Sequence, residues 1–371
     1  MEKRTAGEKG SLGHMDFSIF FAVLLICAFG LVMVFSASYY YAQSEWHDGY
    51  YFVKKQIQYL VLGFICMLVL SRIDYHKLEK LKTAGMLLSI ALLIAVLLFG
   101  EERNGAKRWL EIAGQGFQPS EFCKFAMMLY IVSFMAKYPS RMKDFAHGVV
   151  PVLLMILIIC GLIMLQPNMS MAVSIALMGG VLLFMGGARI SHLLILAVAA
   201  VPMFFLLSLE EYRWARVTIF TDPWKDPLGS GHQLIQSLYA LGSGGLFGQG
   251  LNYSRQKLLY LTYGESDFIF SIIGEELGFI GCVLVMSAYF FLIYRGIRTA
   301  LKCKDRFGSL LAGGITVVLA IQVAVNIGVA TSSIPPTGQT LPFISAGGTS
   351  LFIFLAAVGV LLNVSRNTAR I

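Results

Sequence analysis

An aspartate, Asp267, stands at the mouth of a long apolar run, and two more carboxylates, Glu275 and Glu276, lie inside that run. An ionised side chain in hydrocarbon is expensive, so carboxylates at such positions mark candidate functional sites. At the edge of the run, Asp267 can reach both water and a lipid headgroup, unless it only caps a helix. In a continuous helix the two glutamates lie about 12 to 13.5 Å further along the axis. We expect them to be structural charges that face the bundle interior and find a basic or hydroxyl partner.

A second pair of charges, Glu121 and Lys124, follows Pro119 and Ser120. Ser120 is of the type that caps the first turn of a helix, and Pro119 ends the preceding segment. A helix that starts here places Glu121 and Lys124 three residues apart on one face. The pair either forms a local ion pair that shields both charges, or it also presents Lys124 to an anionic substrate group.

The elements that must position these charges are helices in a membrane. The chain has 371 residues, of which 57% are hydrophobic and 13% charged, and its mean hydropathy is +0.72. This composition is too apolar for a soluble globular protein. The apolar runs are continuous rather than alternating, which favours helices of about 20 residues each. We predict an all-α polytopic membrane protein with ten transmembrane helices near residues 16–37, 52–71, 82–100, 120–136, 148–165, 170–187, 190–208, 268–294, 308–331 and 347–364.

Lys and Arg are distributed unevenly between alternate loops. One set of alternate segments holds 18 of the 29 basic residues and 7 of the 21 acidic ones, a balance of +11 against −3 on the other side. Positive charge is retained on the cytoplasmic side of a membrane, so we expect both termini to be cytoplasmic. The overall charge of +8 then follows from topology, and no nucleic-acid partner is expected. The expected parts are a cytoplasmic tail at 1–15, a single ten-helix domain at 16–365, and a cytoplasmic tail at 366–371.

Three external segments, 101–120, 209–266 and 332–346, are too irregular to be simple connectors, and loops of that length usually bind or react. The second is the large extracytoplasmic loop between helices seven and eight. It contains a glycine-rich run, 242–250, which either builds turns or lets the backbone approach a ligand closely. A helix-like piece, 233–240, precedes that run. The third segment either builds turns or forms a broken helix that lines a cavity.

Five strings in order along the chain resemble a known family. They are Asn-Gly-Ala-x-Arg-Trp (104–109), Gln-Pro-Ser-Glu-x-x-Lys (118–124), Gly-Ser-Gly-Gly-Leu-Phe-Gly (242–248), Asp-Phe-Ile-Phe with Gly-Glu-Glu-Leu-Gly (267–278) and Leu-Pro-Phe-Ile-Ser-x-Gly-Gly (341–348). Together they resemble the SEDS proteins, the shape, elongation, division and sporulation family of RodA, FtsW and SpoVE, over almost the whole chain. The strings at 222–227 and 359–366 are more similar to the FtsW and SpoVE branch than to RodA.

The resemblance implies a multi-pass protein of the bacterial cytoplasmic membrane, a peptidoglycan glycosyltransferase that polymerises lipid II on the outer face for division or sporulation. It implies Asp267 as the catalytic carboxylate, a general base for an acceptor hydroxyl that displaces pyrophosphate in one inverting step. The departing pyrophosphate would be held by cationic groups or by a divalent cation, Mg or Mn, with Asp267 as a candidate metal ligand. Candidate substrate-binding or supporting residues are Arg108, Glu121, Lys124, Arg213, Arg216, Arg255, Lys257 and Ser345.

The resemblance also implies a partner, a class B penicillin-binding protein that acts as transpeptidase, together with other division or sporulation proteins. The chain departs from the family pattern just before the aspartate. The family usually has Pro-Glu, then His or Gln, then Thr, whereas this chain reads Thr262-Tyr263-Gly264-Glu265-Ser266. Asn168 stands where the family has an aspartate.

Two other functions stay open. A transporter that flips lipid II or another polyprenyl-linked sugar would line an alternating-access path with polar groups at mid-membrane. The polar groups of this sequence concentrate on the external side, which favours the enzyme. An inactive scaffold that positions its partner is the third possibility, and it predicts that variants of Asp267 still function.

Overall fold

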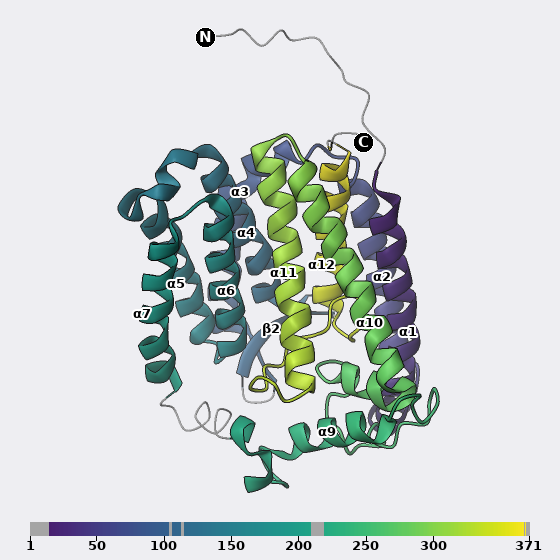
Figure 1. Cartoon of the computed structure of the whole chain (residues 1–371). Coiled ribbons are helices and arrows are strands. Elements are labelled where there is room, and N and C mark those ends of the chain that lie inside the picture. The colour runs from purple at the N-terminus through teal and green to yellow at the C-terminus, as the bar shows by residue number, and fades with distance from the viewer. Residues whose placement is uncertain (1–14, 104–105, 113–114, 209–218, 367, 369–371) are drawn as a thin grey trace.

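The protein, described here by a computed structural model over residues 15–103, 106–112, 115–208, 219–366 and 368, is a bundle of long helices that run side by side (Figure 1). The long helices are α1 (Phe17–Trp46), α2 (Tyr51–Leu70), α3 (His76–Phe99), α4 (Pro119–Lys137), α5 (Val150–Met164), α6 (Met169–Gly186), α7 (Ile190–Ser208), α10 (Ile269–Lys302), α11 (Arg306–Ala330) and α12 (Gly348–Ser365). Shorter elements are η1 (Pro139–Lys143), η2 (Phe145–Val149), η3 (Pro223–Lys225) and α9 (His232–Gly244).

Each predicted apolar run falls on one of the long helices, and the piece predicted at 233–240 falls on α9. Among the described residues, eight helices are long and apolar enough to cross a membrane. The two long helices outside this set are α4, which carries the charges of Glu121, Lys124 and Lys137, and α7, whose described apolar stretch is Ile190–Ala200. The fold is therefore that of a helical, multi-pass membrane protein.

The centre of the bundle is formed by α11 and α12. Within their apolar windows 67% and 78% of the residues are buried, against 17% for α2. The outer helices instead expose large apolar side chains, such as Val61, Leu62 and Ile65 of α2. Such side chains need no protein cover in hydrocarbon, because lipid tails are as apolar as they are.

The two ends of the bundle differ. At one end α1 begins and α12 ends; we call it the terminal end (Figure 1). At the opposite end, the loop end, lie α9 and a small antiparallel sheet in the order β1 (Glu101–Arg103), β2 (Ala106–Ile112) and β3 (Gln115–Phe117). This sheet is a departure from the all-α prediction. The pairing of Arg103 with Ala106 leaves Asn104-Gly105 as the two connecting residues, and that dipeptide is the sequence signal for a hairpin that could have predicted it.

The start of α4 corrects a second prediction. Its N-cap is Gln118 and Pro119 occupies the first turn, so Ser120 does not cap the helix. Proline suits this position because its fixed φ is already helical and no hydrogen bond of its missing N–H is lost. Glu121 and Lys124 still share one helical face, since the helix runs unbroken through both.

Candidate active site

Asp267 lies at the loop end in the turn that leads into α10, and its side chain is partly exposed. The N-cap of α10 is Phe268, so Asp267 is not the cap residue of that helix. Gly338, from the segment that connects α11 to α12, faces the carboxylate. A methyl group on Gly338 would lie 3.3 Å from Asp267 Oδ2, and Gly338 has a left-handed backbone with φ of 68°. The missing side chain therefore leaves space in front of the carboxylate.

The segment opposite Asp267, residues 332–347, is irregular throughout, so the broken-helix alternative for it was wrong. We call it the 332–347 loop. Asn326 of α11 joins it to the Asp267 turn, because its Nδ2 donates to the carbonyl oxygens of Asp267 (2.8 Å) and Gln339 (2.7 Å). Asn326 is buried. One amide of the central helix thus fixes the backbone on both sides of the carboxylate.

Ser345 forms a second tie between the two segments. Its hydroxyl donates to the carbonyl oxygen of Ser266 and accepts from Leu341 N at 2.8 Å. Next to it, Ala346 N donates to Glu265 O at 2.9 Å. Both contacts are to backbone, so Ser345 supports the turn that carries Asp267 rather than facing outward.

Each of the two segments contains a bulky residue with a left-handed backbone. Tyr263 has φ of 59° and precedes the Asp267 turn, and Phe343 has φ of 69° within the 332–347 loop. Such a conformation raises the free energy by on the order of 1–3 kcal/mol for a residue other than glycine, and it persists only where the surroundings over-determine it. Strained backbone on both sides of one partly exposed carboxylate is typical of a functional site.

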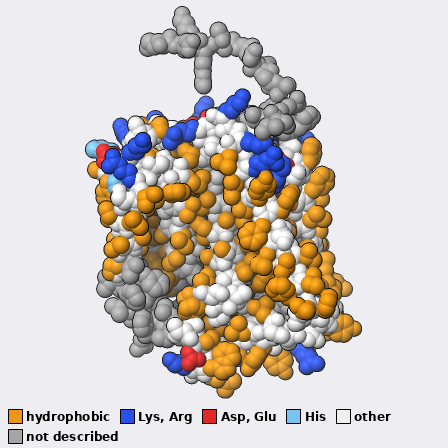
Figure 2. Space-filling model, viewed as in Figure 1, with side chains coloured by type: hydrophobic (Ala, Val, Ile, Leu, Met, Phe, Trp, Pro, Cys, Tyr) orange, Lys and Arg blue, Asp and Glu red, His pale blue; other side chains and the backbone are white. Residues whose placement is uncertain are grey.

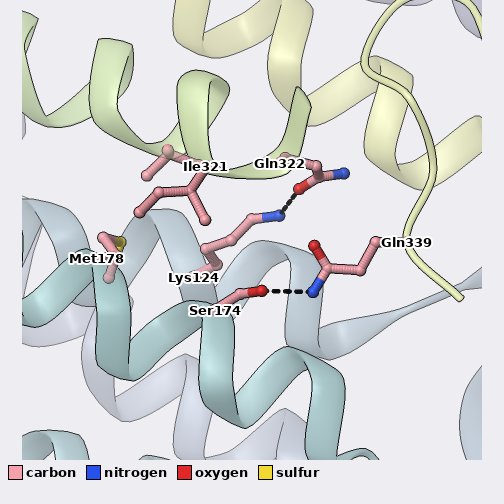
Figure 3. A pocket seen from close by; sticks show the side chains of 7 residues that line it. Lys124, Ser174, Met178, Ile321, Gln322 and Gln339 are labelled. Atoms are coloured by element: carbon pink, nitrogen blue, oxygen red, sulfur yellow. Dashed lines mark hydrogen bonds between the residues drawn. The ribbon is translucent and has the colours of Figure 1, made fainter. Parts of the chain in front are cut away.

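Glu121 and Lys124 form the ion pair that their spacing predicts, with Lys124 Nζ 3.0 Å from Glu121 Oε2. Both side chains are about 95% buried. Lys124 Nζ also donates to Oε1 of Gln322 on α11. Figure 3 shows Lys124 directed at Gln322, beside a narrow cavity that Ser174, Met178 and Gln339 help to line. The space for water centres in that cavity is about 10 Å³, room for about one water molecule.

Gln322 carries the connection on to the 332–347 loop. Its Nε2 donates to the carbonyl oxygen of Thr340 at 3.1 Å. In the same loop Gln339 Nε2 donates to Ser174 Oγ of α6 (Figure 3). We call Glu121, Lys124, Gln322 and Thr340 the Lys124 chain. It runs from a buried ion pair to the loop that faces Asp267, so Lys124 contacts the supports of that loop and not the exposed surface.

Glu276 has the basic and hydroxyl partners that its buried position predicts. Its carboxylate accepts from Lys257 Nζ at 2.9 Å and from Ser36 Oγ at 2.6 Å. The side chains of Lys257 and Glu276 are 1% and 0% exposed. We call Ser36, Lys257 and Glu276 the Glu276 cluster. Lys257 is thereby committed to a buried carboxylate, and of its two predicted roles the supporting one fits this position.

Glu275 turns to the external loop instead. It accepts from the hydroxyl of Ser254 and from the backbone N–H groups of Arg255 (2.9 Å) and Gln256 (3.3 Å). Among the described residues, the donors to this carboxylate all come from the loop. The side chain of Arg255 is exposed, so it keeps access to a ligand at the loop end.

The helix that follows Asp267 is not continuous. α10 is interrupted at Gly278, which has φ of 68° and ψ of −167°. The glycine-rich run fills this break, because Phe279 N donates to Gly245 O at 2.8 Å. A Cβ atom on Gly278 would lie 2.3 Å from Gly248 N, and one on Gly248 would lie 2.2 Å from Glu276 O. These glycines allow two backbones of this protein to meet, which satisfies an interrupted helix inside a membrane protein.

The other predicted cations lie apart from this arrangement. Arg108 donates from Nε to Gln166 O at 3.2 Å and from Nη2 to Pro167 O, so it supports the turn before α6. Asn168 caps α6, accepting from Met171 N at 3.3 Å. Predictions for Arg213 and Arg216 fall outside the described residues.

Sequence reasoning did not single out Glu265 as a site residue. It lies two residues before Asp267 and is 6% exposed. Burial, with a smaller contribution from the charge of Asp267, raises the pKa of Glu265 to about 7, although a hydrogen bond from its own backbone acts in the opposite direction. The signal in the sequence is its position, since the family has His or Gln in this stretch.

The chain is similar to known proteins over almost its whole length. Residues 17–370 match the family model for the cell cycle proteins FtsW, RodA and SpoVE. The chain is 43% identical over 354 residues to stage V sporulation protein E of Bacillus subtilis (strain 168), covering 95% of this chain and 97% of the relative. It is 41% identical over 356 residues to the probable peptidoglycan glycosyltransferase FtsW of Geobacter sp. (strain M18), with the same coverage.

Two solved structures are similar over nearly the full length. One, from work on the structural coordination of polymerization and crosslinking by a peptidoglycan synthase complex, has a TM-score of 0.78 at 32% identity, covering 95% of this chain and 98% of that one. The other, the rod shape determining protein RodA of Thermus thermophilus, has a TM-score of 0.70 at 28% identity, covering 96% and 98%. The protein is a helical membrane protein, and it belongs to the FtsW/RodA/SpoVE family, the SEDS proteins.

Proposed function

We propose that this protein is a peptidoglycan glycosyltransferase that polymerises lipid II at the outer face of the bacterial cytoplasmic membrane, with Asp267 as its catalytic carboxylate. In this proposal all ten long helices span the membrane, the terminal end is cytoplasmic and the loop end is external. The observation that carries the proposal is the partly exposed carboxylate of Asp267, which faces Gly338 on a turn whose backbone is held by Asn326. The relatives named as glycosyltransferases support the reaction class.

The proposed chemistry is displacement of pyrophosphate by a sugar hydroxyl. Asp267 accepts the proton of the attacking hydroxyl as the new glycosidic bond forms, and the pyrophosphate leaves with the electron pair of the bond that breaks. Asn326 and Ser345 hold the turn, so the carboxylate keeps its position during the step. A general base of this kind contributes about 10² to 10⁴ in rate.

The described residues contain no group of three or more His, Cys, Asp or Glu side chains that could hold a metal ion. A divalent cation, Mg²⁺ or Mn²⁺, fits only the open mode in which one carboxylate, water and substrate phosphates complete the shell. In this protein Asp267 would be that carboxylate. Such an ion would neutralise charge on the departing pyrophosphate.

The proposed partner is a class B penicillin-binding protein, which would crosslink the new strands. The solved structure of a peptidoglycan synthase complex with a similar chain supports an assembly of this kind. A role in division or sporulation fits the FtsW and SpoVE relatives.

Reconstitution of the full-length protein with that partner and lipid II tests the proposal. We expect Asp267→Asn to lower glycan polymer formation at least about 100-fold, with an unchanged elution volume and melting temperature. Asp48→Asn is the matched control, because Asp48 is half-exposed between α1 and α2 and forms its ion pair with the exposed Lys54. Equal polymer from Asp267→Asn and wild type would rule out the catalytic assignment and leave the scaffold.

The transporter alternative has its own readout. Proteoliposomes that hold a fluorescent lipid II analogue and no partner report movement across the bilayer through quencher access. If the protein is an enzyme without transport activity, the fraction of the lipid II analogue that is protected from the quencher stays unchanged. The buried charges of the Glu276 cluster, which contact one another, support the enzyme over an open polar path.

A further inference from the structure

A second polar cavity lies at the terminal end, far from the candidate active site. Its volume is about 320 Å³, and it is lined by Ser140, Lys143, Asp144, Phe145, Arg189 and His192. The first four lie in η1, in η2 or at the junction between them, between α4 and α5. Arg189 directly precedes α7, and His192 lies in its first turn. Nothing in the proposed glycosyl transfer uses these residues.

The positive charges of this cavity are available to a ligand. Lys143 and Arg189 are exposed, and neither forms an ion pair with any described residue. Nδ1 of His192 is buried and has no hydrogen-bond partner in the part of the chain described. The ring of His192 is held edge-on by Phe145, with 5.2 Å between ring centroids. Three basic side chains therefore converge on one cavity.

Asp144, the one carboxylate that lines the cavity, already has hydrogen-bond partners of its own. Asp144 Oδ2 lies 2.6 Å from His147 Nδ1, and Asp144 Oδ1 accepts from Ala146 N at 3.0 Å. The hydrogen bond with His147 is the main cause that holds the pKa of Asp144 below its usual value. The charge of Asp144 is thus offset by neighbours within η2, and Lys143 and Arg189 dominate the field of the cavity.

The segment that carries Lys143 is closely packed. Met142 is fully buried beneath it, and a Cβ atom on Gly148 would lie 2.1 Å from Arg141 O. Asp144 N donates to Arg141 O at 2.9 Å. A π-helical turn such as η2 is rare in proteins as a whole. Those turns that do occur are often found at functional sites.

The surface next to the cavity is apolar. From Arg189, α7 continues with exposed side chains Ile190, Leu194 and Ile195. Figure 2 shows Lys and Arg side chains gathered at the terminal end, with hydrophobic side chains covering the flank of the bundle beyond them. Cations at the rim of an apolar flank match a phospholipid, whose phosphate lies at the membrane surface and whose chains lie along the helices.

We propose that this cavity binds the phosphate headgroup of an anionic phospholipid, with Lys143 and Arg189 contacting the phosphate and His192 donating a hydrogen bond. Basic pockets between helices on the cytoplasmic side are suited to such headgroups. The acyl chains would lie against Ile190 and Leu194, which separates this ligand from a soluble phosphate.

Native mass spectrometry of the detergent-solubilised full-length protein tests the site, with palmitoyl-oleoyl-phosphatidylglycerol as probe. We expect Lys143→Gln combined with Arg189→Gln to weaken its binding at least about tenfold. Lys77→Gln combined with Lys80→Gln is the matched control, since both lysines are exposed at the start of α3 at the same end. We expect it to change the affinity less than about twofold.

Two further arms keep the proposal open to refutation. The double variant Lys143→Arg with Arg189→Lys keeps both positive charges. We expect it to bind the lipid with about the affinity of the wild type. An equal loss of lipid affinity in the Lys143/Arg189 variant and the Lys77/Lys80 control would overturn the site. Equally tight binding of palmitoyl-oleoyl-phosphatidylcholine by the wild type would overturn it as well. Glycerol 3-phosphate or inorganic phosphate that binds as tightly as the lipid would overturn the lipid assignment.

Discussion

The Lys124 chain and the Glu276 cluster both contain a buried ion pair, but they end differently. In the Glu276 cluster Lys257, Glu276 and Ser36 contact one another, and Lys257 also donates to Asn252 of the external loop. In the Lys124 chain the contacts lead from Glu121 to Thr340, in the loop that faces Asp267. Buried charge therefore does not by itself indicate chemistry. What distinguishes the two regions is whether the network reaches the loop that faces Asp267.

The largest expected effect on stability lies in the Glu276 cluster. Lys257→Met leaves the fully buried Glu276 without its cation, and we expect a loss of about 3–5 kcal/mol. Thermal denaturation of the purified protein in detergent measures it. Adding Glu276→Gln should recover most of the loss, because the unpaired charge is gone. Lys54→Met, which breaks the exposed pair with Asp48, should change stability by less than about 1 kcal/mol; a similar loss in both variants would contradict the comparison.

A smaller loss of stability with a clear loss of activity is expected in the Lys124 chain. Gln322→Leu removes the donor to Thr340 O, and we expect about 1–3 kcal/mol of destabilisation. Polymer formation should fall about tenfold or more, because a misplaced loop disturbs the geometry at Asp267. Gln236→Leu on α9 is the control for loss of a half-buried amide. Unchanged polymerisation in Gln322→Leu would mean that the chain is structural only.

Gly338→Ala tests the space in front of the carboxylate. The left-handed backbone and the 3.3 Å approach to Asp267 Oδ2 predict a loss of about 1 kcal/mol in stability, with polymer formation about tenfold lower. Gly242→Ala is the control, because a Cβ atom there meets nothing within 4 Å. If Gly338→Ala polymerised lipid II at the wild-type rate, the space that Gly338 leaves in front of Asp267 would have no role in the reaction.

The last prediction concerns Glu265 and the dependence of stability on pH, with no change expected in the reaction itself. Its pKa is raised from 4.5 to about 7 in the folded protein, so the folded protein holds a proton that the unfolded chain loses above pH 4.5. Stability should fall as the pH rises from about 4.5 to about 7 and then level off. Glu265→Gln should flatten this slope and gain about 3 kcal/mol at pH 8. Melting temperatures at pH 5 and pH 8 measure it, with the exposed Glu45→Gln as control; parallel pH profiles would refute it.

The sequence predicted the helices well, because each is a continuous apolar run of bilayer length. It also predicted partners for the buried charges, since hydrocarbon forces such groups to pair. Sequence reasoning missed the small sheet, although Asn104-Gly105 signals a hairpin. It also misplaced the cap of α4, because Ser120 and Pro119 both fit the first turn of a helix. Glu265 was missed as well, because its burial depends on how the loops pack.

The sequence by itself determined the membrane class, the number of long apolar segments and the identity of Asp267 as a candidate, since hydropathy and charge act locally along the chain. Only the tertiary structure decided which polar residues support that aspartate. Asn326, Ser345 and Gln322 reach their partners across turns and helices, and such contacts depend on how helices pack rather than on any spacing in the sequence. The same packing assigned Lys257 to a buried carboxylate and left Arg255 exposed.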